Sequence, residues 1–60
     1  MKKVCEASGI ALWFDPSDER FSVTRDGEIE VETKIPREAV IGWAEKAESA
    51  LLRRLDAWKK

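Results

Sequence analysis

Three glutamates near the middle of the chain are the residues most suited to chemistry. Glu28, Glu30 and Glu32 lie in the segment 21–33, where polar and apolar residues alternate on both sides of Asp26-Gly27. This alternation predicts a β-hairpin. It would set the three carboxylates on one face of a sheet, about 7 Å between neighbours. Residues 15–32 hold seven acids against two arginines, so this part of the chain is acidic.

The three carboxylates have two interpretations. In one, they form a solvated strand face, with Arg20 opposite Glu32, and their charge prevents edge-to-edge aggregation. In the other, they form an acidic platform that binds a protein with a basic surface. A calcium site is not expected, because the ligands would lie in a row and not around a point.

The composition argues against an enzyme. The chain has no histidine and no tyrosine, and it has no glycine-rich phosphate loop. Cys5 is the only cysteine, which excludes an internal disulfide and argues against a zinc site. Without a histidine to activate it, Cys5 is interpreted as a small, half-buried core residue. We therefore expect no catalytic residues, no cofactor and no metal.

The three tryptophans are candidates for interfaces or for the core. In an alternating strand, Trp13 would face away from the core, on the surface that carries the glutamates. There it would be covered by residues 2–8 or a neighbouring subunit, or it would serve as a hot spot for a partner. Trp43 and Trp58 occur at helical spacing and are expected to pack against other side chains.

The pattern predicts a single α+β domain over residues 1–60, a three-stranded antiparallel β-meander packed on one C-terminal helix (βββα). Asp15-Pro16-Ser17-Asp18 has the chemistry of a type I turn, and Pro36 suits the first position of a helix. Residues 2–8 are ambiguous, and we interpret them as an extension of the first strand. The expected elements are a strand over about 4–14, strands over 20–25 and 28–34, and a helix over 36–58.

The register of the central hairpin follows from its alternation. A two-residue loop would place Val23 beside Glu30 and mix the core and solvent faces. A three-residue loop over 25–27 instead pairs Val23 with Ile29, and it gives Gly27 the left-handed position that such loops need. The same register pairs Phe21 with Val31, Ser22 with Glu30, and Arg20 with Glu32.

The predicted helix has a wide apolar arc. One stripe is expected to face the sheet: Val40, Ala44, Ala47, Leu51, Leu55 and Trp58. Two shoulders flank this stripe, and a small sheet cannot cover both. We predict an oligomer interface on the shoulders, with Arg54 either lying over its apolar neighbours or forming an ion pair between subunits. The predicted interface residues are Ile41, Trp43, Ala50, Leu52 and Arg54.

The order of the expected elements is similar in outline to that of the arm-binding domains of phage integrases, which read DNA with the sheet. That resemblance implies a nucleic-acid partner. Glu28, Glu30 and Glu32 stand where a DNA reader needs arginine or lysine. We therefore do not expect direct nucleic-acid binding through the sheet.

The sequence favours a small non-enzymatic protein-interaction module. Its size suits a phage or mobile-element accessory protein that inhibits or adjusts a host complex through Trp13, Arg20, Glu28, Glu30 and Glu32. The alternatives are a self-associating protein that forms a helix-mediated homodimer, and a nucleic-acid regulator that uses the basic helix end. No apolar run is long enough for a membrane span, and the free cysteine fits a reducing compartment, so a cytoplasmic location is expected.

Overall fold

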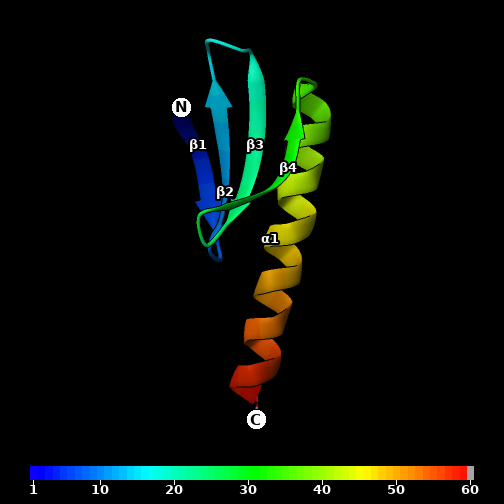
Figure 1. The fold of residues 1–60 in the computed structure, drawn as a ribbon. Helices are drawn as coiled ribbons and strands as arrows, with labels where there is room; N and C mark the ends of the chain where they lie inside the picture. The colour runs from blue at the N-terminus through cyan, green and yellow to red at the C-terminus, as the bar shows by residue number, and fades with distance from the viewer. Residues whose placement is uncertain (60) are drawn as a thin grey trace.

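The computed structural model describes residues 1–59 and the side chains of residues 1–58. Four antiparallel strands pair in chain order, and one helix packs on a single face of the sheet (Figure 1). The predicted α+β class, an antiparallel sheet with one C-terminal helix, is confirmed, but the number of strands is four and not three. The elements are β1 (Lys2–Ala7), β2 (Ile10–Asp15), β3 (Arg20–Arg25), β4 (Glu28–Thr33) and α1 (Pro36–Lys59).

The predicted single strand over 4–14 is wrong, because Ser8 and Gly9 form a turn within it. Both residues have positive φ angles, 54° and 80°, which is the conformation of a two-residue type I′ hairpin loop. Residues 2–7 therefore fold back as β1, with Ala7 opposite Ile10. The Ser-Gly dipeptide is the local signal for this turn.

The predicted three-residue loop between β3 and β4 is also wrong. Asp26 and Gly27, with φ angles of 52° and 85°, form a second type I′ turn, and Arg25 lies opposite Glu28. Thr24 then faces Ile29, whereas Val23 faces Val31, so Glu30 is the extra residue of a β-bulge. The bulge restores the pairing of apolar residues that a two-residue loop alone would disrupt.

The loop between β2 and β3 uses the expected turn chemistry. A carboxylate oxygen of Asp15 accepts a hydrogen bond from the amide of Ser17 at 2.9 Å, and Pro16 supplies a fixed φ at the next position. Glu19 adopts a left-handed φ of 53° just before β3 begins. The loop returns the chain in register, so that Phe14 lies opposite Phe21.

The helix begins at Pro36 after a short capping segment. The amide of Ala39 donates to the carbonyl of Ile35 at 3.1 Å, which is the first helical hydrogen bond. The hydroxyl oxygen of Thr33 accepts a hydrogen bond from the amide of Ile35 at 3.1 Å. This bond connects the end of β4 to the start of α1. Pro36 needs no hydrogen-bond partner at this position because it has no amide proton.

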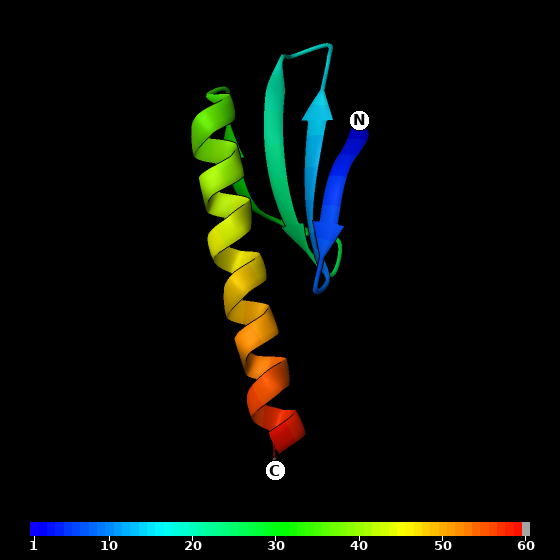
Figure 2. The same cartoon turned by 180° about the vertical axis from the view of Figure 1, so that it is seen from behind.

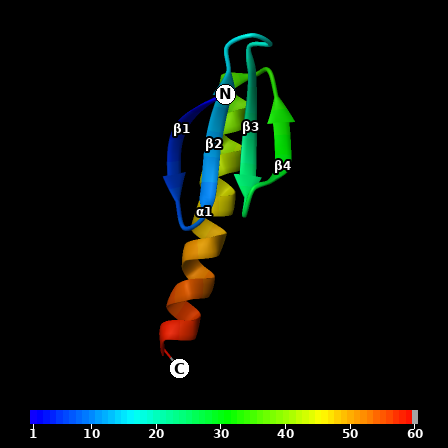
Figure 3. The ribbon, with the colours of Figure 1, turned by 60° about the vertical axis from the view of Figure 1, so that its left-hand side comes forward.

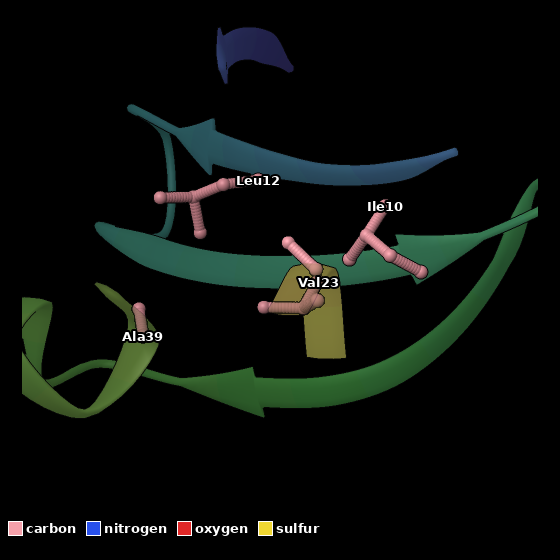
Figure 4. Close-up of a cluster of buried hydrophobic side chains, with 5 residues drawn as sticks. Ile10, Leu12, Val23 and Ala39 are labelled. Atoms are coloured by element: carbon pink, nitrogen blue, oxygen red, sulfur yellow. The ribbon is translucent and has the colours of Figure 1, made fainter. Parts of the chain in front are cut away.

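The core lies between the sheet and a narrow, small-residue side of the helix. Ile10, Leu12 and Val23 point from the sheet, and Ala39 faces them from α1 (Figure 4). Ala47 completes the buried cluster, and Cys5 and Phe21 pack against it. Val23 thus lies in the core as its alternation predicts, whereas Ile29, which was expected beside it, lies on the opposite face and is exposed.

The predicted orientation of the helix is wrong. Of the stripe expected to face the sheet, only Ala47 is buried, and Val40, Leu51 and Leu55 are exposed. The helix instead turns Ala39, Trp43 and Ala50 toward the sheet. The indole Nε1 of Trp43 donates to the carbonyl oxygen of Ile10 at 2.8 Å, which fixes this rotation.

The helix is longer than the sheet that it covers. Its C-terminal turns continue beyond the ends of the strands in three different views (Figures 1, 2 and 3). The molecule measures 45 × 19 × 15 Å and has a radius of gyration of 12.3 Å, whereas a compact domain of this length has one of about 10 Å. No helix in the described part of the chain has the length and apolarity needed to cross a membrane.

Two glycine substitutions should change stability in opposite directions. Gly27→Ala should lower the free energy of unfolding by about 1–2 kcal/mol, because alanine disfavours the positive φ of the turn even though a Cβ would have open space there. Gly42→Ala should raise it by about 0.5–1 kcal/mol, since the helix gains propensity and the new Cβ would lie 3.9 Å from a methyl of Val31. Urea unfolding at a fixed protein concentration measures both, and a stabilised Gly27→Ala variant would contradict the assigned turn.

Candidate functional site

The face of the sheet opposite the helix carries Trp13. Its indole Nε1 donates to the hydroxyl of Thr24 at 2.9 Å, and the ammonium of Lys3 lies 5.3 Å from the ring centroid. The hydrogen bond reaches diagonally from β2 to β3, because Trp13 itself lies opposite Ser22. Trp13 is therefore half-buried by its own sheet and held in one orientation.

A shallow pocket adjoins this indole. It has a volume of about 200 Å³ and is lined by Met1, Trp13, Thr24, Gly27 and Ile29. Ile29 is 52 % exposed, and it lies here and not in the core because the two-residue turn pairs it with Thr24. Trp13 thus neighbours an apolar side chain where the sequence predicted carboxylates.

The three glutamates do not share one face. Glu32 lies opposite Ser22 on the outer face and pairs with Arg20 at 3.0 Å, with both side chains exposed. Glu30 turns to the helix side, where one oxygen lies 3.1 Å from the Nζ of Lys46. Glu28 lies opposite Arg25, and Arg25 in turn lies opposite the buried Ile10.

The expected acidic platform is therefore not formed, and the β-bulge at Glu30 is the physical reason. An extra residue in a strand shifts the alternation, so residues before and after it exchange faces. Trp13, Arg20 and Glu32 still share the outer face. Their role in binding a partner stays a prediction.

Glu30 instead links three elements. Besides Lys46 of α1, it lies 3.3 Å from the Nε of Arg25 in β3. That Nε is buried and does not reach hydrogen-bond geometry with any acceptor, so the contact is an ion pair without a well-aligned hydrogen bond. A single carboxylate thus balances two cations between the sheet and the helix.

An exposed apolar stripe runs along α1, next to the side that packs on the sheet. We define the outer helix stripe as Val40, Ala44, Leu51, Leu55 and Trp58, all of which are exposed. Trp58 is 83 % exposed, Val40 51 % and Leu51 48 %. Sequence periodicity identified these residues, but it assigned them to the sheet interface.

The residues of the predicted oligomer interface fall into three environments. Ile41 and Leu52 are exposed beside the outer helix stripe. Trp43 and Ala50 pack against the core of their own chain, so they are not free for a subunit contact. Arg54 lines a pocket near the turns of the sheet, together with Arg25 and Arg53.

No group of three or more metal-ligating side chains is gathered among the residues that the structure describes. Cys5 is a free, half-buried thiol beside the core. Comparison with protein-family models, with curated proteins and with solved structures gave no match for this chain.

The two ion-paired glutamates should differ in their effect on stability. Glu30→Gln should lower the free energy of unfolding by about 1 kcal/mol, because it leaves Arg25 and Lys46 without their shared, partly buried carboxylate. Glu32→Gln removes one exposed pair and should change it by less than about 0.5 kcal/mol. Chemical unfolding at low and at high salt measures both, and equal effects would show that Glu30 does not link the sheet to the helix.

Proposed function

We propose that this protein is a non-enzymatic interaction module that self-associates through the outer helix stripe. The observation that carries this proposal is the exposure of Val40, Leu51, Leu55 and Trp58 along one side of α1. With Ala44 between Val40 and Leu51, the intervals along the stripe are four, seven, four and three residues, which keeps these residues on one helical face, as in helices that pack against another helix. A second copy of the chain is the partner we infer.

The exposed area supports a missing partner. The chain exposes 4605 Å² of surface, whereas a compact monomer of 6.9 kDa exposes about 4,000 Å². The excess of about 600 Å² is close to one side of a small protein interface, which commonly buries about 800 Å² per partner. This area favours a dimer that forms in a concentration-dependent manner.

The order of side chains along the stripe favours an antiparallel pair. Small Ala44 lies toward the start of the helix and large Trp58 lies toward its end. An antiparallel pair centred on Leu51 places Trp58 of one chain opposite Ala44 of the other, so large and small residues interdigitate. A parallel pair would oppose the two indoles and leave a gap between the alanines.

The charges of the helix favour the same arrangement. In a pair centred on Leu51, residues 43–48, with two acids and one base, lie opposite residues 54–59, with two bases and one acid. Antiparallel helices bring the acidic half of each chain to the basic half of the other. They also align the helix dipoles favourably.

The edges of the sheet offer a poorer route to association. β1 carries an irregularity between Lys3 and Cys5, and β4 carries the bulge at Glu30. Bulged and charged edge strands resist pairing with a further strand. The helix is therefore the side of the molecule that is open to a second copy.

A charge placed on the stripe should dissociate the pair. Leu51→Asp should yield a monomer, because it places an unpaired carboxylate at the centre of an apolar interface. Analytical ultracentrifugation over a wide range of protein concentration would measure the change, with the unmodified chain expected to shift from monomer to dimer as concentration rises.

Ala57→Asp is the matched control. Ala57 is exposed on the same projecting end of the helix, but it lies about 120° around the helix from Leu51. This variant should dimerise as the unmodified chain does, while far-ultraviolet circular dichroism verifies the helix in both variants. A monomer for the unmodified chain at high concentration, or equal dissociation by both variants, would refute the proposal.

A further inference from the structure

A basic pocket lies where the two tight turns of the sheet approach the middle of the helix. The pocket has a volume of about 230 Å³. It is open at the end of the sheet beyond which α1 continues alone. Its lining includes the residues Ser8, Arg25, Asp26, Ser49, Arg53 and Arg54.

The lining of the pocket has more basic than acidic side chains. The lining residues include three arginines and a single acid, Asp26. The nearest acid to Arg25 is Glu30, and this carboxylate is shared with Lys46. Arg53 and Arg54 form no ion pair within the described residues, since none of the four pairs found there involves them.

The positive charges of these arginines repel one another, and an anion bound between them would relieve this repulsion. Arginine is suited to phosphate, because its planar guanidinium presents parallel N–H donors that match two phosphate oxygens. The hydroxyls of Ser8 and Ser49 add neutral donors to the same lining. The Nε of Arg25 is buried against Glu30 at 3.3 Å, so this atom is not available to a ligand in the pocket.

We propose that this pocket binds the phosphate group of a small phosphorylated molecule or phosphate itself. The volume sets the size of the ligand, because sites for drug-sized molecules span about 300–1,000 Å³. A cavity of about 230 Å³ accommodates phosphate or a small phosphate ester and is too small for a dinucleotide. This binding role is separate from the self-association proposed for the outer helix stripe.

The test is a titration of the ¹⁵N-labelled protein, followed by two-dimensional NMR at constant ionic strength. The two probes are inorganic phosphate and ribose 5-phosphate, with chloride as the reference anion. We expect saturable shifts at the amides of Ser8, Gly9 and Ser49. Tighter binding of ribose 5-phosphate would identify an ester as the ligand, whereas equal or weaker binding would identify free phosphate.

Arg53→Gln should weaken phosphate binding about tenfold or more, since a charge-assisted hydrogen bond is lost. Arg53→Lys keeps the positive charge but lacks the two parallel N–H donors of the guanidinium, so this variant should retain part of the affinity for phosphate. Lys34→Gln removes the same charge at an exposed position outside the pocket, and it should bind as the unmodified chain does. The dispersion of the spectrum verifies the fold of each variant.

Chemical-shift changes that rise linearly with ligand concentration and do not saturate would overturn the proposal. Chemical-shift changes of the same size on addition of chloride would also overturn it. So would an equal loss of affinity in Arg53→Gln and Lys34→Gln, because it would show attraction by overall charge alone. Sedimentation of Arg53→Gln keeps the two proposals separable. This variant should still dimerise, since Arg53 lies on the side of the helix away from the outer helix stripe.

Discussion

The close packing of small helix residues against the sheet sets the rotation of α1, and most features of the surface follow from that rotation. Ala39 and Ala47 bring the helix backbone near Leu12 and Val23. The hydrogen bond from the indole of Trp43 to the carbonyl of Ile10 holds the helix at this angle. Any rotation that buried larger side chains would break that bond and push the helix away from the sheet.

The cost of this arrangement is an apolar surface left in water. The exposed leucines and the valine are each about half exposed, so complete burial of each would contribute about 1 kcal/mol, roughly half of the value for a fully exposed side chain. In a single copy that free energy is not recovered, since Leu51 and Leu55 stay partly exposed to water. A chain of 60 residues has a thin core and little stability to spare. This balance is why we regard the outer helix stripe as an interface.

Local sequence signals predicted the elements better than their relative positions. The Asp26-Gly27 dipeptide, the Asp15-Pro16 turn and Pro36 each indicated the correct kind of structure, because each requires only its own neighbours. The Ser8-Gly9 turn carried a similar signal, yet the apolar residues on either side favoured a single strand. The bulge at Glu30 has no local signature, since glutamate has no preference for such a position.

The helix shows why the candidate site was harder to predict than the fold. Its apolar arc covers about half of the helical wheel, and sequence periodicity does not decide which part of that arc meets the sheet. The choice depends on the fit of Trp43 and the alanines to the sheet, which is a property of the assembled core. The glutamates illustrate the same limit, because the two-residue turn and the bulge after it leave Glu30 beside Lys46 and Glu32 on the outer face.

The order of the strands has a consequence for how the chain reaches its native state. Each strand pairs with the strand that precedes it in the sequence, and two of the three connections contain only two residues. Most contacts in the sheet are therefore local in sequence, and proteins of such low contact order fold rapidly, in about milliseconds or less. The helix must dock across β2 and β3 for the chain to form the hydrogen bond between Trp43 and Ile10, which are 33 residues apart in the sequence. The rate-limiting barrier is therefore expected at the docking of the helix onto hairpins that are already formed.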